Sequence, residues 1–308
     1  MPGPCHRSCC RWLLGLLLAV SSQARSSAAD DWSTDQWIGL DAAPPVTIGA
    51  TLSGDQLDNR SFSAYLLAPL TERLLLDLSW SQTQLQGSDN DFDSQDIGGQ
   101  LSWSIDDSIE LLGGYRYQGQ PDELEIDYIT LGMRYNRPGY AVELSRQQGS
   151  ATLHARDNLP AGWPYPRQIS SDLQAWYLRL DWFADRWGLY LSSRSFDYER
   201  DLTALGSNQL LQLVAAPGAL EQGGLLIEEQ LRLGLHHHGP ALGINLEWAR
   251  SSSAIDSLSS DSLQLDFSYL MNTRGPGDSE TRLLFGIGHV FDAASPWSLV
   301  AGLEWTGG

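Results

Sequence analysis

The feature that most constrains this chain is an alternation of apolar and polar residues that recurs in short stretches after residue 45. It is clearest in the series Leu74-Leu76-Leu78-Trp80, Trp176-Leu178-Leu180-Trp182 and Leu263-Leu265-Phe267-Tyr269. Successive side chains of a strand point to opposite faces, so each stretch predicts a strand with one apolar face. The apolar rows are rich in Leu and end in Trp or Tyr, which is typical of strands whose outer face touches lipid.

Fourteen stretches carry this strand pattern between turn-forming residues. We expect strands at 46–53, 60–68, 73–85, 94–105, 108–118, 124–136, 139–148, 170–183, 187–198, 225–236, 240–251, 261–271, 280–291 and 297–306. Twelve strands remain possible if 46–53 and one weak neighbour stay outside the sheet. The pattern therefore predicts an all-β fold with 12 or 14 strands.

The predicted connections alternate between short and long. Asp106-Asp107, Arg137-Pro138 and His237-His238-Gly239 are tight, whereas 149–169 and 199–224 are long. Short periplasmic turns and longer extracellular loops are typical of transmembrane antiparallel up-and-down β-barrels, and an even strand number places both ends in the periplasm.

In this pattern the chain resembles bacterial outer-membrane β-barrel proteins of the porin-like class, over essentially its whole length after the N-terminal segment. Its length and strand number look like those of monomeric fourteen-stranded porins. Fourteen-stranded fatty-acid transporters are a weaker match, because their plug segment is longer than the lead at 30–45. Such barrels usually end on an aromatic residue, and Trp305 stands three residues before the end of this chain.

The N-terminal segment reads as a secretory signal. Arg7 and Arg11 precede an apolar run from Trp12 to Val20, and small residues lead to an expected cleavage after Ala29. The run is too short to span a bilayer as a helix. We therefore expect a cleavable signal peptide at 1–29, a periplasmic lead at 30–45 and a barrel at 46–308, located in the outer membrane.

The composition excludes several function classes. Cys5, Cys9 and Cys10 would leave with the signal, so no disulfide, thiolate metal site or cysteine nucleophile is expected. The chain has no lysine; once residues 1–29 are removed, 16 arginines face 38 acidic residues, a net charge of −22. Nucleic acid is therefore not an expected partner, since no basic stripe exists to neutralise phosphates.

The alternation also assigns the side chains that face the lumen. The set we expect to line it is Asp77, Glu110, Arg116, Arg134, Glu143, Arg179, Asp181, Arg194, Glu228, Arg232, Glu247 and Asp266. Facing rows of Arg and carboxylate could set a transverse field that selects solutes in an open channel. Alternatively, they could be paired charges that fill and rigidify the barrel. Small inward residues such as Gly114 and Gly286 leave room and favour a pore.

Three motifs suggest other chemistry. The acidic run Asp89 to Asp93, with Asp96, resembles a calcium loop, but Ser94 and Gln100 stand where that motif needs Gly and Glu. His236-His237-His238 could bind zinc, although adjacent strand residues point to opposite faces. His154, with Asp157, is the one candidate for a catalytic pair, and no Ser or paired Asp stands at a spacing that would make it the nucleophile. The plainer interpretations are a solvated loop for the acidic run, a turn for the histidine run and no enzyme activity for His154.

Two long connections could shape the channel. The one at 199–224 is apolar at 208–216 and could fold inward as a constriction or gate, or cap the rim from outside. The aromatic segment Trp163-Pro164-Tyr165-Pro166 fits either surface recognition or rim packing.

We therefore expect a monomeric porin-like channel for small hydrophilic solutes, without cofactor or bound metal, surrounded by outer-membrane lipid and lipopolysaccharide. The alternative is a closed structural or accessory barrel that serves envelope integrity or polysaccharide export.

Overall fold

The structure is a computed structural model, and it describes residues 45–56, 58–86, 91–121, 123–154, 168–200, 226–255, 258–272, 279–291 and 296–307. The predicted signal peptide at 1–29 and the lead at 30–45, apart from residue 45, lie outside these residues. None of the described residues forms a helix that is long and apolar enough to cross a membrane.

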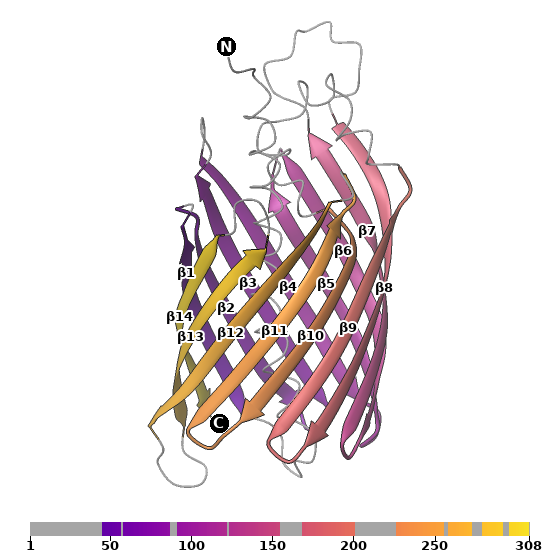
Figure 1. The fold of residues 1–308 in the computed structure, drawn as a ribbon. Helices are drawn as coiled ribbons and strands as arrows, with labels where there is room; N and C mark the ends of the chain where they lie inside the picture. The colour runs from indigo at the N-terminus through magenta and orange to yellow at the C-terminus, as the bar shows by residue number, and fades with distance from the viewer. Residues whose placement is uncertain are drawn as a thin grey trace, which may run out of the picture.

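Fourteen strands make up most of the described chain (Figure 1). They are β1 (Val46–Asp55), β2 (Arg60–Thr71), β3 (Leu74–Gln86), β4 (Asp91–Ser104), β5 (Ile109–Gln120), β6 (Leu124–Arg137), β7 (Tyr140–His154), β8 (Gln168–Ala184), β9 (Trp187–Tyr198), β10 (Ile227–His238), β11 (Leu242–Ser253), β12 (Ser259–Asn272), β13 (Glu280–Phe291) and β14 (Trp297–Gly307).

The strands form one closed antiparallel barrel. Each strand pairs with its neighbours in sequence, and β1 closes the sheet by pairing with β14, with Val46 opposite Gly307. The predicted up-and-down barrel of fourteen strands is confirmed. The alternative of twelve strands is wrong, because the stretch at 46–53 belongs to β1 and pairs along both of its edges.

Side chains alternate between the two faces of the wall, and the outer face is the apolar one. Leu131 and Trp176 point outward and are 66% and 57% exposed, whereas Arg134, Asp181 and Glu247 point inward and are buried. Burying apolar side chains normally stabilises a protein in water, so an outer wall of exposed Leu and Trp is suited to lipid. The buried charged side chains of this wall lie inside the barrel.

The two ends of the barrel differ. We call the end with the tight connections at 72–73, 138–139 and 185–186 the turn end, and the opposite end the loop end. Figure 1 shows β7 and β8 extending beyond β1 and β14 at the loop end. These two strands are longer than the predicted 139–148 and 170–183.

The prediction missed this extra length because the alternation of apolar and polar side chains reverses at the loop end of β6–β9. There the inner face carries Leu124, Ile126, Leu153 and Leu173, which form the main buried apolar cluster with Ala254 and Ile255 from the β11–β12 connection. The outer face carries polar side chains, among them Gln148, Asp172 and Gln174, which are exposed. This part of the wall has the pattern of a sheet in water, so the lipid pattern did not predict it.

The histidine run differs from its predicted place in a tight turn. His237 and His238 are the last residues of β10, and the turn begins at Gly239, whose backbone N–H donates to the carbonyl of Leu242 (3.0 Å). The backbone N–H of His238 still donates across to the carbonyl of Arg186 (2.8 Å). The prediction of a turn at His237-His238-Gly239 is therefore wrong by two residues, because strand pairing continues to the end of the run.

Candidate functional site

The inward-facing charged side chains of the barrel wall form the candidate site. Eleven of the twelve residues predicted to line the lumen lie on the inner face, because the strand register places them on the same face of the wall as Glu304 and Tyr65. They are Asp77, Glu110, Arg116, Arg134, Glu143, Arg179, Asp181, Arg194, Arg232, Glu247 and Asp266. Glu228 differs. It falls at a β-bulge, where the register with β11 shifts between Ile227 and Glu229, and its side chain is exposed.

These charges are unevenly distributed around the barrel. Within the described strand interiors, the inner face of β5–β10 carries Arg116, Arg134, Arg179, Arg194 and Arg232 with three acids, Glu110, Glu143 and Asp181. The rest of the wall, β11–β14 and β1–β4, carries Arg282 with five acids, Asp77, Asp96, Glu247, Asp266 and Glu304. One half of the wall thus has an excess of arginine and the other half an excess of carboxylate.

The most buried charges form a network near the turn end of β6 and β8. Asp181 accepts from Arg179 at 2.8 Å and from Arg134 at 3.4 Å, and its side chain is completely buried. Glu143 stands directly opposite both arginines in the register. Burying charges costs desolvation energy, which close pairing and hydrogen bonds offset. This network therefore stiffens one side of the wall and holds its arginines in fixed positions.

A second pair lies closer to the loop end. Arg116 on β5 binds Asp96 on β4 through two hydrogen bonds, from Nε at 2.9 Å and from Nη2 at 2.6 Å. Gln118 donates to the same carboxylate at 2.9 Å. A bidentate contact of this kind fixes both position and orientation. The sequence did not single out Asp96 as a lumenal residue, because its neighbours Asp91 and Asp93 suggested a calcium loop.

Two tyrosines cross the inner wall in the same way. The hydroxyl of Tyr65 on β2 reaches across Gly49 on β1 and donates to Glu304 on β14. The hydroxyl of Tyr190 on β9 reaches across Gly234 on β10 and donates to Glu247 on β11. A Cβ at either glycine would overlap with the tyrosine ring. Each glycine therefore allows a large ring to lie flat along the wall, an arrangement that depends on strand register and that the sequence alone did not reveal.

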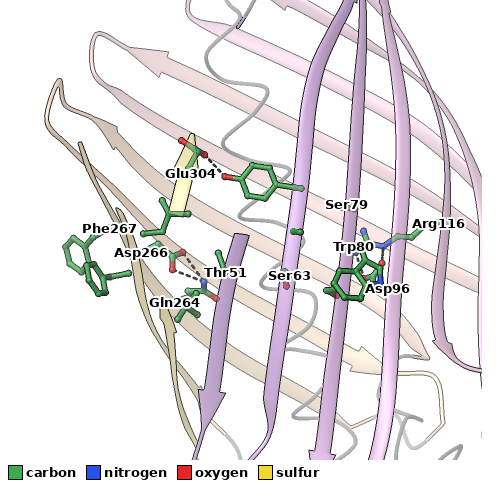
Figure 2. A pocket seen from close by; sticks show the side chains of 16 residues that line it. Thr51, Ser63, Ser79, Trp80, Asp96, Arg116, Gln264, Asp266, Phe267 and Glu304 are labelled. Carbon is green, nitrogen blue, oxygen red and sulfur yellow. Dashed lines mark hydrogen bonds and ion pairs between the residues drawn. The ribbon is translucent and has the colours of Figure 1, made fainter. Parts of the chain in front are cut away.

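Figure 2 shows a cavity lined by side chains of β1–β5 and β12–β14. Arg116 points to Asp96 on one side of it, and Gln264 donates to Asp266 (2.9 and 3.0 Å) on the other. Asp266 also occupies the space that a side chain at Gly286 would need. Gly286 therefore makes room for the carboxylate of Asp266, in addition to leaving space in the lumen.

A second cavity, which we call the polar cavity, lies along the inner face of β3–β9. Its lining includes Gln100, Thr130, Ser145 and Gln147, together with the charged and aromatic residues Asp77, Arg116, Tyr128, Glu143, Tyr177, Arg179 and Arg194. It shares Ser79 and Arg116 with the cavity in Figure 2. The linings of the two cavities therefore overlap at these two residues.

Arg194 differs from the other arginines of the polar cavity. Its guanidinium lies over the ring of Tyr177 (5.1 Å to the centroid) and near that of Phe196 (5.9 Å). Its Nε is buried and has no hydrogen-bond partner among the described residues. Stacking on aromatic rings fixes the plane of a guanidinium without neutralising its charge.

The possible metal sites do not assemble in the described part of the chain. His236 and His238 face inward with ring centroids 4.8 Å apart, whereas His237 faces outward against Trp187 at 4.5 Å. Asp93 and Asp96 point to opposite faces of β4, and residues 87–90 lie outside the description. No group of three or more His, Cys, Asp or Glu side chains able to hold a metal occurs among the described residues.

The candidate catalytic histidine lies on the outer face. His154 is the last residue of β7, and its Nε2 is 3.4 Å from the carboxylate of Glu125. Its proposed partner Asp157 lies outside the described residues, as do the segments 155–167 and 201–225, which include Trp163-Pro164-Tyr165-Pro166 and most of the predicted gate.

No family model and no curated protein matches this sequence. Among solved structures, the CymD monoaromatic hydrocarbon channel is similar at 10% identity, over 86% of this chain and 89% of that chain, with a TM-score of 0.48. The Pseudomonas putida toluene transporter TodX is similar at 10% identity, over 91% and 93% of the two chains, with a TM-score of 0.47. The KdgM porin in complex with disordered oligogalacturonate is similar at 8% identity, over 84% and 98%, with a TM-score of 0.42.

Proposed function

We propose that this protein is an outer-membrane channel that passes small hydrophilic solutes. The observation that carries the proposal is the division of the inner wall into a half with excess arginine and a half with excess carboxylate, inside a closed barrel with an apolar outer face. A dipolar or hydrogen-bonding solute that passes between the two halves is oriented by the transverse field, whereas an apolar solute gains nothing from it.

The placement of the inward aromatic rings supports an open lumen. Tyr65 and Tyr190 each lie along the wall above a glycine, instead of projecting toward the barrel axis. Side chains held in this way take little of the central space. The channel needs no cofactor and carries out no chemistry. We propose that it acts as a monomer in contact with outer-membrane lipid and lipopolysaccharide.

A second candidate function is a closed accessory barrel that serves envelope integrity or polysaccharide export. The network of Arg134, Arg179 and Asp181 favours it, because buried and tightly paired charges are suited to filling and stiffening a barrel. The apolar cluster on the inner face of β6–β9 at the loop end points in the same direction, since its side chains are buried against one another instead of facing a water-filled lumen.

Single-channel recording in a planar lipid bilayer tests the two candidates. The refolded protein, shown to be folded by the heat-dependent shift of its gel mobility, is added to a membrane in potassium chloride. Discrete and steady current steps are expected. Folded protein that gives no steps would exclude the channel and leave the accessory barrel.

A further inference from the structure

We propose that Arg194 is the anion-binding residue of the polar cavity, and that the solute it receives is a small polyhydroxylated anion, with a carboxylate or a phosphate. This inference rests on the proposed channel function, which it refines by naming the class of solute. It starts from the different states of the three arginines in that cavity.

Two of the three arginines are already occupied. Arg116 donates from Nε and Nη2 to the two carboxylate oxygens of Asp96. Arg179 places Nε and Nη2 at 2.8 Å from a single carboxylate oxygen of Asp181, Oδ1. Each arginine has less to offer an incoming anion than an arginine without a carboxylate partner, because the paired carboxylate neutralises its charge.

Arg194 is held in a different way. Its contacts are the aromatic rings of Tyr177 and Phe196, and no carboxylate among the described residues forms an ion pair with it. A guanidinium that stacks on a ring still presents its N–H groups in the plane of the fork. Arg194 therefore combines a fixed orientation with an unneutralised charge, the two properties that binding an anion requires.

The surroundings of Arg194 indicate the rest of the solute. Thr130, Ser145, Gln147 and Gln100 line the same cavity and supply hydroxyl and amide groups that both donate and accept hydrogen bonds. Glu143 and Asp77 also line it, and they accept hydrogen bonds from hydroxyl groups but repel a second negative charge. A solute with one anionic group and several hydroxyl groups satisfies this set, whereas a bare apolar anion or a polyanion does not.

Three matched probes separate the charge from the hydroxyl groups. Gluconate, sorbitol 6-phosphate and sorbitol share a six-carbon polyhydroxylated chain and differ in carrying a carboxylate, a phosphate or no charge. Binding of each radiolabelled probe to the folded, detergent-solubilised full chain is measured by equilibrium dialysis, and the effect of each on single-channel current is recorded separately. We expect at least one anion to bind and to reduce the current, and sorbitol to do neither. The stronger of the two anions identifies the preferred group.

Two substitutions test the residue. Arg194→Gln removes the charge and is expected to weaken binding of the anion about tenfold or more, the size of one charge-assisted hydrogen bond. Arg194→Lys is expected to retain part of the affinity. Arg146→Gln is the matched control, because Arg146 also lies over a ring, that of Trp176 at 5.7 Å, but on the outer face. It should bind the anion as the wild type does.

The two readouts distinguish failure of the site from failure of the channel. Current steps without any effect of either anion, or equal effects on the wild type and Arg194→Gln, would overturn the anion site and leave the channel. Binding that is lost in Arg194→Gln, in a protein that never conducts, would support the site and overturn the channel. Equal binding of sorbitol and gluconate would also overturn the site, since it would show that the cavity does not recognise the negative charge of gluconate.

Discussion

At the scale of single residues, the two tyrosines that cross a glycine are the most specific feature of the inner wall. Gly49→Ala and Gly234→Ala each place a methyl group where the ring of Tyr65 or Tyr190 lies. The ring must move, and Glu304 or Glu247 then loses its hydroxyl donor. We expect each variant to be destabilised by about 1–3 kcal/mol in urea unfolding from lipid vesicles.

Gly54→Ala is the matched control for this prediction. Gly54 also lies on β1, but a Cβ there meets only the carbonyl oxygen of Asn59, at an ordinary 3.5 Å. Its effect should be small. A second check is the double variant with Tyr65→Ala, in which Gly49→Ala should cost less because no ring is displaced. Equal costs at Gly49 and Gly54 would contradict the proposed contact.

The buried network of Asp181 gives a second prediction at this scale. Asp181→Asn removes the buried carboxylate that pairs with both Arg134 and Arg179. Because two buried arginines then lose their partner, we expect the free energy of unfolding to fall by about 3–5 kcal/mol in the same urea experiment. Glu280→Gln, which breaks the partly exposed pair with Arg282 (3.5 Å), should cost less than about 1 kcal/mol. Similar losses in both variants would mean that the network at Asp181 is no better shielded from water than this partly exposed pair.

At the scale of elements, the sequence predicted every strand but not every strand end. The alternation works wherever the outer face touches lipid, because Leu and Trp must then occupy every second position. It failed at the loop end of β7 and β8, where Leu153 and Leu173 point inward. A reversal of faces reads as a break in the pattern, so residues 149–154 were predicted as loop although they are strand.

This reversal predicts where the membrane ends on β8. Leu178 and Gln174 both lie on its outer face, two outward positions apart. Leu178→Arg places a charge in the apolar band and should cost up to about 2–4 kcal/mol, whereas Gln174→Arg should cost about 0–1 kcal/mol. Urea unfolding in vesicles measures both. Equal costs would place Gln174 in lipid and contradict a water-exposed extension of the strand.

At the scale of the whole molecule, alternation predicted the face of most of the charges, but not that of Glu228 at the bulge in β10 and not which charges pair. Arg116 is held by Asp96, a residue that the acidic run assigned to a loop, and Glu247 is held by Tyr190 from two strands away. Such contacts depend on register and closure, since β1 meets β14 only in the folded barrel. The uneven division of charge between the two halves of the wall likewise appears only once the strand order is known.

This division predicts how the channel responds to single charges. The described interior holds nearly equal numbers of arginines and carboxylates, so the wild type should be only weakly selective between K⁺ and Cl⁻, despite the formal net charge of −19 of the whole chain. Arg232→Gln should shift the reversal potential in a potassium chloride gradient toward cation preference, and Asp266→Asn should shift it toward anion preference, because each changes one inward charge. Glu125→Gln, on the outer face, changes the net charge by the same amount and should shift nothing. If Glu125→Gln shifts the potential as much as Asp266→Asn does, the charge outside the wall governs selectivity, and the divided inner wall does not.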